Sequence, residues 1–125
     1  MLIESSVSDV RKPGGGSFNT TSDARLKENV VNYTQGLTAI KSLRPVNYNY
    51  NDVTNLGKDT NHKTFTGLIA QEVEQTSLTN MISTGSDGYK LLDPSELTFT
   101  LVNAVKELSA QVDALKAEVA ALKGN

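Results

Sequence analysis

The chain has 125 residues, of which 38% are hydrophobic and 6% aromatic. It is therefore short of the bulky side chains that a self-sufficient core needs, and oligomerisation would supply the missing burial. Its 12 basic and 14 acidic residues give a net charge of −2, which argues against nucleic-acid and membrane partners. The absence of cysteine excludes disulfides and thiolate metal sites, and the single histidine, His62, cannot build a metal site without carboxylates, so no metal or cofactor is expected.

Residues 1–21 are predicted to be an arm rather than part of a packed body. Three glycines follow Pro13, and such a sequence loses too much backbone entropy to hold regular structure, so we interpret it as a linker. A short strand over residues 2–10 is possible, but it would need a pairing partner.

The stretch that begins at Ser22 allows two interpretations. Ser22 is a good N-cap for a helix, in which case Lys27 is a solvated side chain. Alternatively, Ser22 is a nucleophile that attacks the carbonyl of Thr21, and Lys27 is its base. An exposed lysine titrates near 10.4, so burial or a cation such as Arg25 would have to lower its pKa. Residues five apart do not share a helix face, so the pair requires a turn of the chain or a contact between subunits.

The residues up to 92 are predicted to form a small α+β body of short helices and β-hairpins. Strand patterns occur over residues 46–50, 64–69, 81–83 and 89–92. Short helices are predicted over residues 34–42 and 70–74. The polar residues 51–63 are predicted to be a long exposed loop or hairpin tip, and glycines at 85 and 88 indicate a tight hairpin turn.

The sequence from Asp93 onward predicts one long helix. Asp93 is an N-cap acceptor, Pro94 suits the first helical position, and Glu96 would complete a capping box. No helix breaker follows until Gly124. Apolar residues then alternate at spacings of four and three, with valine at a and leucine at d: Leu101, Val105, Leu108, Val112, Leu115, Val119 and Leu122. This narrow stripe indicates a coiled coil rather than an amphipathic helix packed on its own domain, and it leaves dimer or trimer open.

Four motifs in order resemble a known family. They are Ser22-Asp23-x-Arg25-x-Lys27-x-Asn29, then Leu43-x-Pro45 leading to Tyr48 and Tyr50, then the block Gly67–Val73, and last Ala104–Leu108 in the terminal helix. Together they resemble the autocleaving intramolecular chaperone domains at the C-termini of phage tail spikes, tail fibres and endosialidases. The resemblance covers residues 22–123.

The resemblance implies a homotrimer that holds three parent chains in register while their stalk folds and then cuts itself off. Ser22 would be the nucleophile and Lys27 the general base, Thr21–Ser22 the scissile bond, and Asp23, Arg25 and Asn29 supporting residues. Residues 1–21 would end the parent fibre, and 22–125 would be the chaperone domain, with a body over 22–92, an arm over 48–65 and a parallel trimeric coiled coil over 93–123. The client would be the parent's own stalk, in the host cytoplasm during virion assembly, and the released domain would be absent from the mature particle.

Three rival interpretations stay open. The first is a trimerisation and chaperone module that does not cleave. The second is the related self-cleaving domain of a membrane-bound transcription factor, like that of myelin regulatory factor, which would need a membrane segment and a DNA-binding domain outside these residues. The third is the end of an adhesin-type stalk, which leaves the block Gly67–Val73 unexplained. A small-molecule enzyme is not expected, because the sequence has no phosphate loop.

Overall fold

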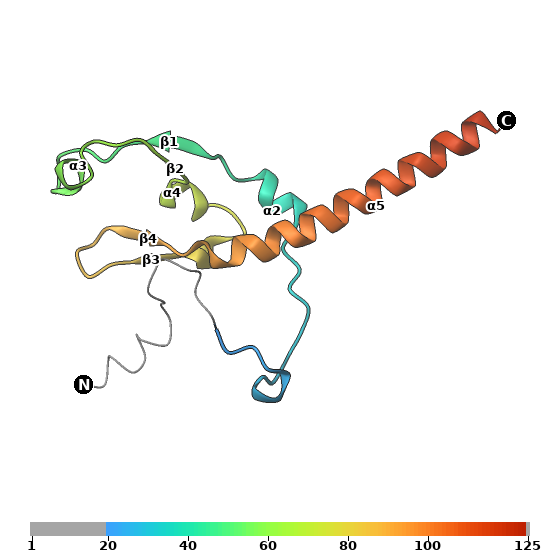
Figure 1. Ribbon diagram of the computed structural model, residues 1–125, viewed down its shortest axis with the longest axis horizontal. Coiled ribbons are helices and arrows are strands. Elements are labelled where there is room, and N and C mark those ends of the chain that lie inside the picture. Colours follow the sequence, from blue (N-terminus) through green and yellow to red (C-terminus); the bar gives the residue numbers. More distant parts are fainter. Residues whose placement is uncertain (1–19, 125) are drawn as a thin grey trace. The chain divides into compact units, whose positions relative to one another are not determined.

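The computed structural model describes residues 20–124, and the chain falls into two compact units that divide between Asn32 and Tyr33. Figure 1 shows the elements of both units, and each unit is described by itself. The arm predicted over residues 1–21, with its linker and possible strand, lies outside the described residues except for its last two positions. Its predicted boundary at Thr21–Ser22 stays a prediction.

In unit 1 the described regular structure is one short 3₁₀ turn, η1 (Ala24–Leu26). Asp23 is its N-cap, and the Asp23 side chain accepts a hydrogen bond from the backbone N–H of Arg25. The prediction that Ser22 caps a helix here is therefore wrong on two counts. The cap lies one residue later, because the Asp23 carboxylate reaches the free N–H, and the turn ends at Lys27, whose backbone is extended.

Unit 2 confirms the predicted α+β class, with short helices, two β-hairpins and one long helix. Strand β1 (Val46–Tyr48) pairs antiparallel with β2 (Phe65–Gly67), and β3 (Ile82–Thr84) pairs antiparallel with β4 (Lys90–Leu92). The helices are α2 (Leu37–Lys41), α3 (Leu56–Asp59), α4 (Ala70–Val73), the 3₁₀ turns η2 (Thr79–Met81) and η3 (Pro94–Glu96), and α5 (Leu97–Lys123). Each strand and short helix predicted for residues 34–92 is present, but its bounds differ from the predicted ones.

The core of unit 2 is small. Its buried residues come from α2, from α4 and from the segment that follows α4: Ala39, Val73, Leu78 and Met81. Half-buried leucine and isoleucine side chains from β3, β4 and the start of α5 close over them. This core fixes the N-terminal end of α5, because Leu97 packs against it.

Helix α5 is also held by a polar contact with the residues before α2. The Thr100 side chain is fully buried, and its hydroxyl donates to the carbonyl of Glu96. Since that donation uses the only hydroxyl proton of Thr100, the Tyr33 hydroxyl must be the donor in the 2.8 Å bond between the two side chains. Asn103, one turn further along α5, donates to the carbonyls of Tyr33 and Gln35.

The N-terminus of α2 is closed by a carboxylate from α5. Glu107 accepts a hydrogen bond from the backbone N–H of Leu37, which would otherwise lack a partner within the short helix. A Cβ at Gly36 would collide with this carboxylate, so a larger residue there would push the Glu107 side chain away from the Leu37 N–H. We refer to Tyr33, Gly36, Thr100, Asn103 and Glu107 as the α2–α5 clasp.

The predicted loop over residues 51–63 is wrong in one respect, because its tip contains the helical turn α3. Residues on both sides of α3 bond to one another: the Val53 N–H donates to the Asn51 side chain, and His62 Nε2 lies 2.8 Å from Asp52 Oδ1. Gly57 is buried against these residues, where a Cβ would meet the Asn51 carbonyl at 2.6 Å. The polar composition of the segment therefore reflects bonds within the tip itself.

The start of α5 is preceded by the turn η3, and the predicted capping box does not form. Asp93 does cap this turn, accepting from the Ser95 N–H at 3.0 Å. The Asp93 N–H already donates to the carbonyl of Met81, so it has no need of the Glu96 carboxylate. Glu96 instead accepts from the Asn80 side chain at 3.0 Å. Only one of the two bonds of the predicted capping box is therefore present, the one that Asp93 accepts.

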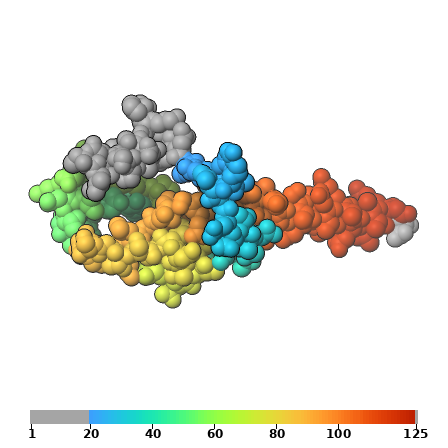
Figure 2. Space-filling model, turned by 90° about the horizontal axis from the view of Figure 1, so that it is seen from below, coloured from blue at the N-terminus to red at the C-terminus, as the bar shows by residue number. Residues whose placement is uncertain are grey.

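The predicted seam of α5 is open to solvent in the single chain. Its seven residues have exposed fractions from 45% at Val112 to 76% at Leu122. Figures 1 and 2 show the C-terminal half of α5 extending beyond the other described elements of unit 2. No helix in the described part of the chain is both long and apolar enough to cross a membrane.

Candidate functional site

The structure brings Ser22 and Lys27 together. Lys27 Nζ donates a hydrogen bond to Ser22 Oγ at 2.8 Å, although the two residues are five positions apart. The turn η1 lies between them and reverses the chain, which is the condition that their spacing imposes. The contact is therefore made within one chain, and no second subunit is needed to form it.

Asp23 and Arg25 hold this turn. The Asp23 carboxylate accepts from the Arg25 backbone N–H at 2.9 Å, and from the Arg25 guanidinium through Nε at 3.0 Å and NH2 at 2.8 Å. The Arg25 side chain lowers the pKa of Asp23, since both of its bonds favour the charged carboxylate. The expectation that Arg25 supplies a free cation beside Lys27 is not met, because its guanidinium is paired with Asp23.

Asn29 lies two residues beyond Lys27 and has a φ of 56°, in the left-handed region. Asparagine adopts this conformation more readily than most residues, so the motif places it where the backbone turns again. Asn29 therefore affects the path of the backbone after Lys27. Thr21, on the other side of Ser22, is exposed, so the bond between these two residues is open to solvent in the single chain.

Both Ser22 and Lys27 are exposed, which bears on the chemistry that this pair could perform. A lysine in its ammonium form can only donate to a serine hydroxyl, whereas a general base must accept the hydroxyl proton. The described chain supplies the contact and the orientation of Ser22 and Lys27. It does not remove water from them. Among residues 20–124, no three or more potential metal ligands come together.

One family model matches the chain over residues 22–82, that of the chaperone of endosialidase, peptidase S74. This segment belongs to the chaperone of endosialidase family. No curated protein matches the chain. The family's description gives the segment a chaperone role, and its name places it among the peptidases.

The endosialidase chaperone segment begins at Ser22 and includes the turn η1, the β1–β2 arm and the residues up to the start of β3. The resemblance stated from the first three motifs is thus confirmed. The fourth motif, Ala104–Leu108, lies in α5 beyond the matched segment, so the trimeric coiled coil stays a prediction.

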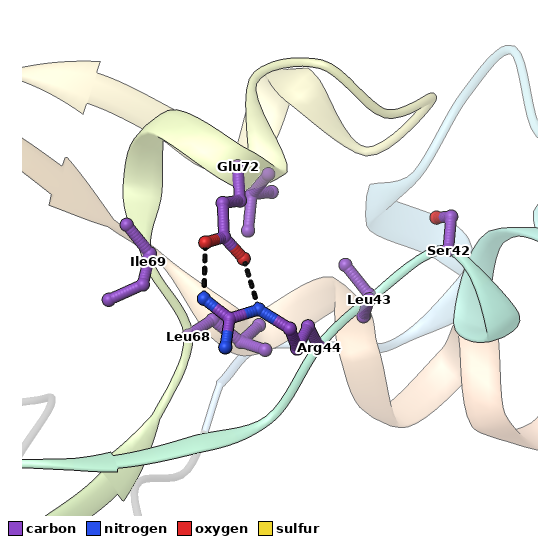
Figure 3. A pocket seen from close by; sticks show the side chains of 7 residues that line it. Ser42, Leu43, Arg44, Leu68, Ile69 and Glu72 are labelled. Atoms are coloured by element: carbon purple, nitrogen blue, oxygen red, sulfur yellow. Dashed lines mark hydrogen bonds and ion pairs between the residues drawn. The ribbon is translucent and has the colours of Figure 1, made fainter.

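The block Gly67–Val73 of the family segment joins two parts of unit 2. Arg44, just before β1, donates from Nε and NH2 to the two carboxylate oxygens of Glu72 in α4, and this pairing lowers the pKa of Glu72. Figure 3 shows the two side chains bonded to one another at a small pocket that Leu43 and Leu68 also line. Sequence reasoning missed this pair, because its members are 28 residues apart and no periodicity links them.

The β1–β2 arm, residues 48–65 of the family segment, carries an aromatic cluster. Tyr48, Tyr50 and Phe65 have ring centroids 5.4 to 5.9 Å apart, and Lys63 Nζ lies 5.5 Å from the centre of the Phe65 ring. The Tyr48 ring also covers Gly67 on the neighbouring strand. These contacts stiffen the base of the arm, because edge and stacked aromatic pairs add to burial.

Proposed function

We propose that the chain is an intramolecular chaperone that trimerises, assists the folding of its parent fibre and then releases itself by cutting the Thr21–Ser22 bond. The single observation that carries this proposal is the 2.8 Å contact of Lys27 Nζ with Ser22 Oγ inside a segment of the endosialidase chaperone family. Its support is geometric, because a nucleophile and its base must lie within hydrogen-bonding reach.

The proposed reaction needs no diffusing substrate. Neutral Lys27 takes the hydroxyl proton of Ser22, and Ser22 Oγ attacks the carbonyl carbon of Thr21. The C–N bond then breaks, Lys27 returns the proton to the amine of Ser22, and the Thr21 acyl group remains as an ester on Ser22 Oγ. Water hydrolyses this ester, giving a carboxylate at Thr21 and restoring the hydroxyl. Because the reacting groups are neighbours in one chain, proximity supplies much of the barrier reduction.

The chaperone part of the proposal is supported by the seam of α5, whose leucines and valines are exposed in the single chain. Association of three copies through this seam would bury these side chains and hold three parent chains in register. We propose the parent's own stalk as the client and the β1–β2 arm as the part that contacts it. The site of action would be the host cytoplasm during virion assembly, and the released domain would be absent from the mature particle.

Mass spectrometry of the full chain tests the cleavage. We expect a cut between residues 21 and 22 that Ser22→Ala and Lys27→Ala both abolish while the oligomer persists. Matched controls are Ser86→Ala and Lys41→Ala, which change exposed residues of unit 2 and should leave the cut unaltered. An unchanged cut in Ser22→Ala would end the assignment of Ser22 as the nucleophile.

A second candidate function is a trimerisation and chaperone module that does not cleave. The observation in its favour is the exposure of both Ser22 and Lys27, which leaves Lys27 in contact with water. It predicts full-length chains of constant mass in the same experiment, together with an intact oligomer.

A further inference from the structure

We propose that an ion pair between Glu118 of one copy of α5 and Lys123 of the next fixes the register of the parallel coiled coil that the resemblance implies. The pair presupposes the self-association proposed above. It adds to that association the residues that determine orientation and register.

Neither charge has a partner within its own helix. On a helix the neighbours of a side chain lie three and four positions away. For both residues all such neighbours within the described helix are apolar: Ala114, Leu115, Ala121 and Leu122 around Glu118, and Val119 and Ala120 before Lys123. The structure gives neither side chain an ion pair with any residue from 20 to 124, and both are exposed.

The two charges also cannot meet on one helix. Five positions turn a side chain by about 140° around the axis at 3.6 residues per turn. With valine at a and leucine at d, Glu118 takes a g position and Lys123 the e position of the following heptad. In a parallel, in-register coiled coil, these two positions face one another across neighbouring chains, and charges there select partner and orientation.

An antiparallel arrangement would not use these charges. It places g opposite g and e opposite e, so Glu118 of one copy and Lys123 of another would lie on different sides of the seam. Lys123 would then face the e position near the other end, which is Val102. A lysine beside a valine gains no ion pair, so charge complementarity favours the parallel partner.

The position of the pair along α5 leaves it free for such a contact. The α2–α5 clasp uses the N-terminal part of the helix, through Thr100, Asn103 and Glu107. The seam is centred roughly 100° around the axis from that face. Glu118 and Lys123 lie in the C-terminal part, which extends beyond the other described elements of unit 2 (Figure 2). A second copy of the chain can therefore reach them without disturbing the body.

The orientation is tested by a single introduced thiol. The chain has no cysteine, so Leu122→Cys in the full chain places one thiol in the last seam layer. Parallel, in-register helices bring these thiols together, and mild oxidation should give a disulfide-linked pair on a denaturing gel. Antiparallel helices would hold them about 30 Å apart at 1.5 Å per residue. Absence of the linked pair in an assembled sample would overturn the proposal.

The ion pair is tested by exchanging the charges. Glu118→Lys and Lys123→Glu each place like charges opposite one another, and each should lower the melting temperature of the assembly by about 5 °C. The double variant restores opposite charges and should recover most of the loss. Asp113→Lys and Lys106→Glu are matched controls, because they make the same changes of charge at b positions away from the seam. The effects of the seam variants should shrink in 1 M salt, where the Debye length is about 3 Å.

The outcomes separate this proposal from the proposed function. If the double variant melts at the temperature expected from adding the two single losses, the residues are not coupled and the ion pair is refuted, while cleavage and assembly are untouched. If the wild-type chain sediments as a single copy, both the pair and the proposed trimer fail. If the chain assembles and the cycle shows coupling but no cut is found, the pair stands and only the cleavage is rejected.

Discussion

At the residue scale, the contact between Ser22 and Lys27 is set by two residues that lie between them. The Asp23 carboxylate binds three N–H groups of Arg25, and these bonds hold the turn over which Lys27 reaches back. The motif thus contains two residues in contact, Ser22 and Lys27, and between them the two residues that hold the turn. The sequence singled out Ser22 and Lys27, which the structure places in contact, but it assigned the cap to Ser22 and left Arg25 as a free cation. The first error arises because spacing cannot tell which of two neighbouring acceptors a backbone N–H will choose. The second arises because spacing cannot tell that the Arg25 guanidinium pairs with Asp23.

We expect Arg25→Lys to slow the cut before Ser22 by about tenfold. Lysine keeps the positive charge but lacks the planar fork that binds both Asp23 oxygens, so the turn should loosen. The measurement is the time course of fragment formation by mass spectrometry. Arg44→Lys makes the same change in another Arg–carboxylate pair and should leave the rate unchanged. Equal rates for Arg25→Lys and the wild type would show that the turn needs no such support.

At the scale of elements, the sequence predicted what local patterns encode and missed what long-range contacts add. Alternation predicted β1, and the valine–leucine spacing predicted how far the last helix extends. The predicted N-cap, Asp93, caps the turn η3 instead, and α5 begins three residues later than predicted, at Leu97. The tip helix α3 was missed because side chains on both sides of it complete it: the Thr54 hydroxyl accepts from the Leu56 N–H, and the Thr60 hydroxyl donates to the Leu56 carbonyl. The carboxylate of Glu107 at the N-terminus of α2 was missed because the two are 70 residues apart.

We expect the cap at Asp93 to make the stability of α5 depend on acid pH. The Ser95 backbone N–H lowers the pKa of Asp93, so the charged cap stabilises the fold above the unfolded value of about 3.9. Its contribution is lost as pH falls through the lower folded value. Asp93→Asn retains a capping oxygen that does not titrate, so its melting temperature should fall less between pH 5 and pH 2. Circular dichroism of both proteins gives the comparison, and parallel declines would show that the cap is not the titrating group.

We expect Thr100→Val to lower the free energy of unfolding of unit 2 by about 1 kcal/mol. Valine nearly keeps the volume of the buried side chain but removes the acceptor for the Tyr33 hydroxyl and the donor to Glu96. Urea unfolding of the full chain gives the value. Thr98→Val, two positions before it on an exposed part of the same helix, is the matched control and should change stability little. A loss of the same size in the control would assign the effect to helix propensity rather than to the α2–α5 clasp.

At the scale of the whole molecule, α5 has two faces in different surroundings. One face, with Thr100, Asn103 and Glu107, holds the residues before and within α2. The other carries the seam, which the body of the same chain leaves exposed. The low aromatic content agrees with this structure, because a chain with few bulky side chains forms a small core and leaves the long helix uncovered. Composition predicted that burial would have to come from other copies, and the heptad pattern predicted where.

We expect Val112→Glu to separate assembly from folding. A glutamate in the central seam layer places charges together on the axis of the proposed bundle, where burying an unpaired carboxylate is costly. Sedimentation should then report a single copy, because the layer cannot close. The body should stay folded, since Val112 belongs to the exposed seam and not to the buried core of unit 2. The near-ultraviolet signal of the tyrosines reports this folding, as the chain has no tryptophan.

Ala114→Glu adds the same charge at an exposed position outside the seam and should leave the assembly intact. If Val112→Glu and Ala114→Glu assemble equally well, the seam is not the surface through which the copies associate.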